Sequence, residues 1–279
     1  NGKKLKNSML APEGYMMVDC DSSQIEARVL AWLADQGELV SAFAAGEDVY
    51  IKMSSKIYNI PEEEVTKEQR FVGKTTILGC GYGMGAVRFA DQLQSFGTHM
   101  ALEESRRVIN IYRDSNWKIA TFWRDCQNML VEMSRGNSGS FGPDGIVKYG
   151  SDGCDGWVLL PSGLKMRYDD LQYVQGERGP EFSYRTRRGR TRIYGGKVTE
   201  NICQAIARCI IGDQMLAIAK KYKVALTVHD SVVCCVPENE LEEAAAYIEG
   251  CMNTASSWAE GLPITCESDS GKSYGEAAG

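Results

Sequence analysis

The sequence is poor in the residues that build zinc sites and disulfide-stabilised folds. Its 279 residues include only two histidines, His99 and His229, and none of its ten cysteines forms a C-x-x-C pair. Structural zinc sites draw their ligands from closely spaced cysteines and histidines, and small disulfide scaffolds need a much higher density of cysteine. We therefore expect neither kind of site, and we expect the cysteines to be reduced thiols.

Long apolar runs and a surplus of positive charge are also missing. No stretch reaches the 18 or more apolar residues of a membrane-spanning helix, and no signal peptide opens the chain, so no membrane partner is expected. The first residue is Asn rather than Met, which suggests a piece of a longer protein. The net charge of −6 is unusual for a protein that binds nucleic acid, because phosphate contacts generally require a basic surface.

One segment departs from this acidic balance. Residues 183–197, SYRTRRGRTRIYGGK, contain five arginines and a lysine and no acid. Two interpretations remain open from the composition alone. The segment is either a solvated hairpin turn or a strip that faces a phosphate backbone.

The most informative pattern is a set of four side chains at four-residue intervals: Arg70, Lys74, Leu78 and Tyr82. Each such step in an α-helix advances one turn plus about 40°, so these side chains would form one stripe on a helix expected over about residues 66–83. A helix face buried in the core would not carry the two cations Arg70 and Lys74. A face exposed only to solvent would have no need of Leu78 and Tyr82. The order fits a ligand with phosphates at one end and a sugar and base at the other.

The apolar periodicity predicts a mixed α+β protein. Residues 15–18 indicate a short buried strand that leads into a helix from Ile25, and helical patterns dominate from Glu38 to about Met133. Strands are expected at 157–163 and 164–168, paired around a turn. A long helix from Lys197, a hairpin over residues 224–237 and a final helix complete the order. A helical part is thus inserted into one that carries an antiparallel sheet.

Two aspartates stand where predicted strands end. Asp21 lies between the first strand and its helix, and Asp230 lies at the tip of the hairpin. Carboxylates at strand ends are aimed by rigid backbone and stay accessible, so the pair could share two Mg²⁺ ions about 4 Å apart. A single Asp more often caps a helix or a turn, and Asp21 alone fits that role too.

Three segments resemble, in order, motifs A, B and C of the family A (polymerase I type) DNA polymerases. DSSQIEARVLA resembles D-x-S-Q-I-E-x-R, RFVGKTTILGCGYG resembles R-x-x-x-K-x-x-x-F-x-x-x-Y-G, and VHDSVV resembles V-H-D-E. LPSGLKMRY and ENICQAIAR are similar to palm segments of that family, and GKSYGEA is similar to phage-encoded members. The resemblance runs from about Leu5 to the end of the chain.

The resemblance implies a template-directed DNA polymerase that transfers deoxynucleotides from dNTPs to a primer 3′-hydroxyl by a two-metal mechanism, for DNA replication or repair. Two Mg²⁺ ions, replaceable by Mn²⁺, are the implied cofactors, and template-primer DNA and dNTPs are the implied partners. A monomer in the cytoplasm of a bacterial host is expected if the chain is phage-encoded. The implied site residues are Asp21, Asp230 and Lys74 for catalysis; Asp21, Ser22 and Asp230 for metal; Glu26, Arg70, Lys74, Leu78 and Tyr82 for the nucleotide; and Gln204, His229, Asn201 and Gly83 for DNA.

The same resemblance assigns roles and boundaries. Ser22 would offer its carbonyl, Glu26 would exclude the ribose 2′-hydroxyl, and Lys74 would act as a general acid toward pyrophosphate. The palm would comprise residues 1–40, with motif A, and residues 151–279, with motif C; the fingers would comprise residues 41–150. The thumb and the proofreading exonuclease are expected upstream in the full-length protein.

Four positions depart from the family pattern. Ser22 replaces a usual Tyr, which does not matter if only its carbonyl is used. Leu78 stands where Phe is common and keeps an apolar contact without a ring or a hydroxyl. Ser231 replaces the Glu that usually follows the motif C aspartate, and Asn201 is one residue out of step with the usual Asn before Gln204.

Two alternative functions remain. A single-subunit RNA polymerase resembles this layout and often has H-D-S at motif C, but Glu26 argues against it, because an RNA polymerase must admit the 2′-hydroxyl. The other is a truncated module that binds DNA without useful turnover. A P-loop at Gly73-Lys74-Thr75 is not supported, because the motif needs Gly five residues before Gly73 and Glu68 stands there.

Overall fold

The computed structural model describes residues 2–176 and 179–278, which divide into two compact units. Unit 1 consists of the residues up to Glu26 together with those from Ala205 onward, and unit 2 is Ala27–Gln204. These boundaries lie elsewhere than the palm and fingers boundaries expected from the sequence, and the helices α2 and α9 each run across one of them. The assignment of palm and fingers therefore remains a proposal.

Unit 1 is built on a four-stranded antiparallel sheet in the order β11-β1-β10-β9. Its strands are β1 Tyr15–Ser22, β9 Lys223–Val228, β10 Ser231–Pro237 and β11 Cys266–Gly271, and its helices are α1 Gly2–Asn7, η3 Glu238–Glu240, α10 Leu241–Met252 and α11 Tyr274–Ala277. The strand expected to end at Val18 continues to Ser22. The strand is longer because β1 lies between β10 and β11 in the sheet. Its residues pair with both neighbours as far as Asp21.

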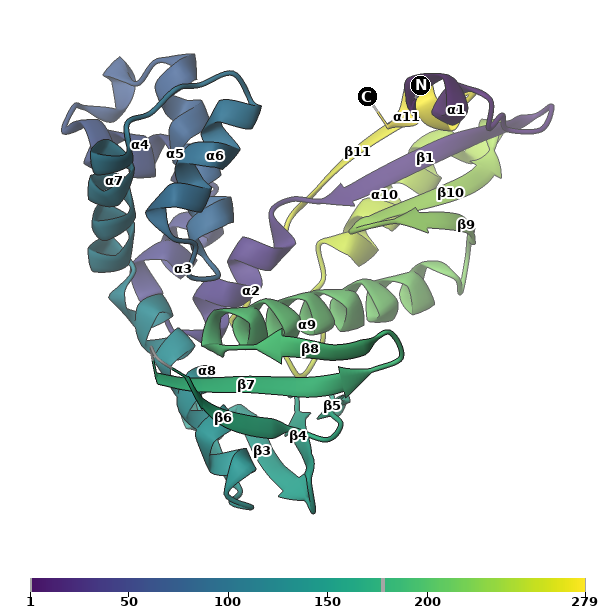
Figure 1. The fold of residues 1–279 in the computed structure, drawn as a ribbon. Coiled ribbons are helices and arrows are strands. Elements are labelled where there is room, and N and C mark those ends of the chain that lie inside the picture. The colour runs from purple at the N-terminus through teal and green to yellow at the C-terminus, as the bar shows by residue number, and fades with distance from the viewer. Residues whose placement is uncertain (1, 177–178, 279) are drawn as a thin grey trace. The chain divides into compact units, whose positions relative to one another are not determined.

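The two faces of this sheet are used differently. Val18 and Cys20 of β1 point to a core formed with α10 and the last part of α9, where Ile248 and Ile211 are buried. Figure 1 shows α10 beside the strands of this sheet. Because side chains alternate along a strand, Asp19 and Asp21 belong to the opposite face. The acids of β1 are thereby kept away from the main apolar core.

The helical part of unit 2 packs around one apolar cluster. Its helices are α2 Ile25–Leu33, which begins in unit 1, α3 Gly37–Ala44, α4 Val49–Tyr58, η1 Glu62–Glu64, α5 Lys67–Cys80, α6 Ala86–Ser95, α7 Leu102–Ser115 and α8 Trp117–Ser134. Buried side chains of this cluster include Tyr50, Ile77, Phe89 and Tyr112. α4 and α5 lie side by side over much of their length (Figure 1). The helical region expected from Glu38 to about Met133 is confirmed.

Two further antiparallel sheets complete unit 2. One has the order β2-β3-β4-β5 and the other β6-β7-β8. Their elements are β2 Gly139–Phe141, η2 Pro143–Gly145, β3 Val147–Asp152, β4 Asp155–Leu159, β5 Lys165–Tyr168, β6 Gln172–Gly176, β7 Gly179–Thr186 and β8 Gly189–Ile193, followed by α9 Gly195–Ile218. Val158 pairs with Met166, which confirms the predicted pairing of these two segments. The protein is of the α+β class, as the sequence predicted.

The helix that carries the four-residue stripe is shorter than expected. Thr66 caps its start: the Thr66 hydroxyl accepts from the Gln69 amide at 3.2 Å, and the Gln69 side chain accepts from the Thr66 amide at 2.9 Å. The helix ends at Cys80, so Tyr82 lies in the turn beyond it. Gly83 in that turn has φ +80°, a left-handed conformation that glycine adopts readily.

Within residues 2–176 and 179–278, no helix combines the length and apolar character needed to cross a membrane. All ten cysteines are free thiols.

Candidate active site

Asp21 and Asp230 are brought together at one end of the sheet in unit 1. Asp21 is the register partner of Ser231, the residue that follows Asp230. The Ser22 amide donates a hydrogen bond to the Asp230 carbonyl at 3.2 Å. His229 and Asp230 form the two-residue tip between Val228 and Ser231, and His229 there has φ +55°. The two carboxylates predicted from distant motifs are thus neighbours.

A cavity of about 510 Å³ lies over these residues, within unit 1. Its lining is dominated by acids that come from β1, the β9–β10 turn and β11, while Lys6 and His229 are its only basic side chains among the described residues. The acids are Asp19, Asp21, Asp230, Glu267 and Asp269.

Two of these carboxyl groups, those of Asp21 and Asp19, have raised pKa values. Burial, followed by the charges of Asp230, Asp19 and Glu267, raises the pKa of Asp21 to about 6. Burial also raises the pKa of Asp19, although the Ser231 hydroxyl donates a hydrogen bond to this carboxylate. Ionised Asp21 is therefore held against its own desolvation and against the repulsion of its acidic neighbours. A bound cation would relieve that repulsion.

Sequence reasoning missed three of these acids. Asp19 stands two residues before Asp21, and strand alternation alone would have placed both on one face. Glu267 is the register partner of Asp21 on β11, and Asp269 is that of Asp19. Nothing in the local sequence around Glu267 signals this pairing, because it arises only when β11 joins the sheet.

Ser22 is buried at the end of β1, and its hydroxyl has no hydrogen-bond partner in the described part of the chain. Its predicted contribution is the backbone carbonyl and not this hydroxyl. Among the described residues, no group of three or more His, Cys, Asp or Glu side chains is arranged so that it could hold a metal ion. The predicted donor set of two aspartates and one carbonyl is smaller than such a group.

In unit 2, α5 presents part of the predicted nucleotide stripe. Lys74 and Leu78 are exposed on the helix, and Leu78 retains 42% of its accessible surface although it is apolar. The Arg70 guanidinium pairs with Asp48 at 2.8 Å and lies 5.2 Å from the centre of the Tyr50 ring. These contacts hold Arg70 at the first turn of the exposed face.

The remaining predicted residues lie on three elements. Glu26 is in the first turn of α2 and is half-buried, and Tyr82 and Gly83 lie in the turn after α5. Gln204 is exposed on α9, whereas the Asn201 amide donates to the Tyr168 hydroxyl at 3.2 Å. Their roles toward nucleotide and DNA stay predictions.

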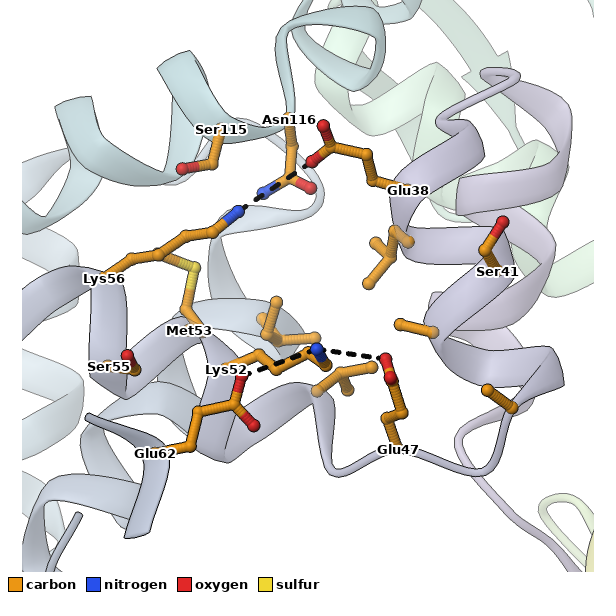
Figure 2. Close-up of a pocket in the computed structure, with 15 residues that line it drawn as sticks. Glu38, Ser41, Glu47, Lys52, Met53, Ser55, Lys56, Glu62, Ser115 and Asn116 are labelled. Carbon is orange, nitrogen blue, oxygen red and sulfur yellow. Dashed lines mark ion pairs between the residues drawn. The ribbon is translucent and has the colours of Figure 1, made fainter. Parts of the chain in front are cut away.

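A second cavity of about 520 Å³ lies in unit 2 and contains none of the predicted site residues. Lys52 reaches across it to Glu47 and Glu62 at 3.1 and 3.4 Å, and Lys56 lies 4.0 Å from Glu38 (Figure 2). The charges on its rim are thus paired within the protein.

Comparisons with known proteins point to one family. Residues 1–135 match the family model for DNA polymerase family A. The chain is 31% identical over 277 residues to a DNA polymerase of Bacillus phage SP02, covering 94% of this chain and 42% of the relative. The chain belongs to DNA polymerase family A.

Other members of family A are similar over nearly the whole chain. DNA polymerase I of Borreliella burgdorferi is 26% identical over 275 residues, covering 99% of this chain and 26% of the relative. The fold matches the POL domain of Pol1 from M. smegmatis, solved in complex with DNA primer-template and dNTP, with a TM-score of 0.68 and 21% identity over 100% of this chain and 43% of that one. This family A chain thus spans less than half the length of these relatives.

Proposed function

We propose that the chain carries the palm and fingers of a template-directed DNA polymerase that adds deoxynucleotides from dNTPs to a primer 3′-hydroxyl. The observation that carries the proposal is that Asp21 and Asp230, from distant segments of the chain, line one acid-rich cavity. Membership of DNA polymerase family A supports it. We place the reaction in the cytoplasm of a bacterial host and expect a monomer.

The carboxylates of the cavity suit Mg²⁺. Magnesium prefers hard oxygen ligands, and the negative charges of Asp230, Asp19 and Glu267 add to the burial that raises the pKa of Asp21. Asp21 and Asp230, with the Ser22 carbonyl, would hold the ions. When bound, two such ions lower the pKa of a primer hydroxyl and neutralise a leaving pyrophosphate, and Mn²⁺ can serve the same purpose.

The side chains of α5 and of the turn that follows it supply the contacts to the nucleotide. Arg70 and the exposed Lys74 would bind the triphosphate, with Lys74 giving a proton to the departing pyrophosphate. Leu78 would lie against the sugar and Tyr82 against the templating position. Glu26 would occupy the space that a ribose 2′-hydroxyl needs, which restricts the substrate to deoxynucleotides.

DNA contacts would come from residues outside α5. Gln204, exposed on α9, would reach the minor groove, and His229 beside Asp230 would contact the primer end. Asn201 and Gly83 complete the proposed set.

Primer extension by the 279-residue chain tests the proposal. We expect template-dependent addition of dNTPs with Mg²⁺ or Mn²⁺, and loss of at least about a hundredfold in rate for Asp230→Asn, as for removal of one strong electrostatic contact in a site. Asp114→Asn is the matched control, since Asp114 is an exposed acid on α7. Absence of any addition by the parent chain with either metal would favour the alternative of a module that binds DNA without turnover.

A further inference from the structure

The β7–β8 hairpin of unit 2 separates its arginines from its apolar side chains. Arg185 is the register partner of Arg190, and Phe182 is that of Ile193. Because side chains alternate along each strand, Arg185, Arg190 and Arg192 lie on one face and Phe182 and Ile193 on the other. The apolar pair is buried, whereas the three arginines are exposed.

Two of these arginines already have acidic partners. Arg190 pairs with Asp170, and Arg192 pairs with Glu181 of β7. A second nitrogen of Arg190 donates to the Asp170 carbonyl at 3.0 Å. The contacts of Arg190 hold the hairpin against the segment that carries Asp170, and the ion pair of Arg192 lies within the hairpin.

The tip of the hairpin carries two more arginines that its own structure does not require. The Thr186 hydroxyl donates to the Gly189 carbonyl at 2.7 Å, and the Arg188 amide donates to the Thr186 hydroxyl at 3.2 Å. Gly189 adopts φ +114°. Of the two arginines between Thr186 and Gly189, these contacts use only the Arg188 amide. The side chains of Arg187 and Arg188 are exposed and have no ion pair within the part of the chain that the structure describes.

The positive charge of this hairpin is only partly balanced within the protein. Arg185 and Arg190 are directly opposite across the ladder, where like charges destabilise a strand pair, although Asp170 pairs with Arg190 and the charge of Arg185, after the hydrogen bond from the Asp170 amide, helps to lower the pKa of Asp155. Arg187 and Arg188 add two positive charges at the tip of the β7–β8 hairpin, in a chain whose net charge is −6. Repulsion of this kind is relieved by a polyanion that spans several guanidinium groups.

We propose that Arg187 and Arg188, supported by Arg185, form a contact for the phosphate backbone of DNA, in addition to the nucleotide and DNA contacts proposed above. This inference rests on the proposed function, because a DNA polymerase would bring DNA to the chain as the polyanion. Guanidinium groups bind phosphate oxygens in a bidentate manner, and such contacts are independent of base sequence. Duplex and single-stranded DNA both offer these phosphates.

The salt dependence of DNA binding tests the contact. The affinity of the 279-residue chain for a labelled duplex and for a labelled single strand is measured by fluorescence anisotropy across a salt series. For the double variant Arg187→Gln and Arg188→Gln we expect weaker binding and a slope of log K against log salt that is smaller by about one to two, since each phosphate contact contributes about 0.9. The DNA form whose slope changes identifies the source of the phosphates.

A charge-matched control is available. Arg106 on α7 and Lys220 after α9 are exposed, so Arg106→Gln with Lys220→Gln removes the same charge elsewhere. We expect this control to keep the parent slope, and we expect all variants to melt at the parent temperature. Equal slopes for the hairpin variant and the parent on both DNA forms would overturn the proposal, as would an equal loss in the control.

The two proposals fail in different ways. A parent chain that extends primers while the hairpin variant keeps the parent slope would reject the hairpin contact alone. A parent chain that adds no nucleotide, with a reduced slope in the hairpin variant, would reject the proposed polymerase activity and keep the contact.

Discussion

Asp21 on β1 and Glu267 on β11 are directly opposite each other in the antiparallel ladder of unit 1, and both line the acidic cavity. Glu267 contributes to the raised pKa of Asp21, after burial, Asp230 and Asp19. Like charges opposite each other in a sheet are unfavourable by roughly 0.2–1 kcal/mol. The acids of this cavity therefore reduce the stability of the fold in the absence of a cation.

We predict that Glu267→Gln stabilises the metal-free protein. Removal of one opposing charge should raise the melting temperature in EDTA near pH 8 by about 1–3 °C, given about 2–4 °C per kcal/mol for a domain of this size. Glu13→Gln, an exposed acid before β1, is the control and should leave the melting temperature unchanged. A lower melting temperature for Glu267→Gln would show that the carboxylate is not held against repulsion.

Gly73 allows α4 and α5 to pack closely. A Cβ at this position would collide with the Ser54 hydroxyl and with the Tyr50 carbonyl, and the latter is rigid backbone. We predict that Gly73→Ala lowers the free energy of unfolding by about 1–3 kcal/mol in urea titrations. Gly212→Ala, in open space within α9, should instead raise it by about 0.5–1 kcal/mol. The prediction fails if both substitutions have the same sign.

Asp48 has two separable roles. It caps α4 by accepting from the Tyr50 and Ile51 amides, each at 3.0 Å, and it pairs with Arg70. Asn caps a helix as well as Asp, so Asp48→Asn should cost less than about 1 kcal/mol in the free energy of unfolding, as expected for a half-exposed ion pair. Asp48→Ala loses the cap as well and should cost about 1 kcal/mol more.

The effect of Asp48→Asn should depend on pH. Burial alone would raise the pKa of Asp48, but hydrogen bonds from the Ile51 amide and from Arg70 outweigh it and hold this pKa below its ordinary value. A lowered pKa in the folded state contributes stability above the ordinary value, near pH 4, and that stability is lost as the pH falls through the folded value. Urea titrations at a series of pH values should therefore show the parent and Asp48→Asn converging in acid; a gap that widens in acid would contradict this.

Leu78 should make the protein a poor user of dideoxynucleotides, because this exposed side chain carries no hydroxyl at the proposed sugar contact. We predict that Leu78→Tyr improves dideoxynucleotide use relative to deoxynucleotides by about fivefold, the equivalent of one hydrogen bond of about 1 kcal/mol. Leu78→Phe supplies the ring without the hydroxyl and should resemble the parent. Primer-extension termination assays measure the ratio, and efficient termination by the parent would refute the prediction.

Glu26 should set sugar selectivity. We predict that Glu26→Ala raises ribonucleotide incorporation relative to deoxynucleotide incorporation by about 10–200-fold. This is the range expected when a binding pocket no longer excludes a small group, here the ribose 2′-hydroxyl. Single-nucleotide incorporation kinetics give this ratio. If the parent already incorporates both sugars equally well, the alternative of a single-subunit RNA polymerase is favoured.

Much of the fold was predictable because local patterns agree with the tertiary structure. Helical periodicity located the region from Glu38 to about Met133, and the strand pairs at Val158–Met166 and around His229 follow from alternation and turn residues. The end of α5 was misplaced because a four-residue spacing continues through Tyr82, whereas the glycines that follow Leu78 let the backbone leave the helix at Cys80.

The class of the fold and the family could be predicted from the amino-acid sequence, since Asp21, the four-residue stripe and Asp230 each lie in a short motif whose chemistry is local. Which acids share the cavity became evident only from the folded chain, because Glu267 and Asp269 reach Asp21 and Asp19 through strand pairing between distant segments. The fold also pairs Arg190 and Arg192, while Arg187 and Arg188 are left at the tip. Charge balance depends on neighbours in space, and a linear sequence does not contain them.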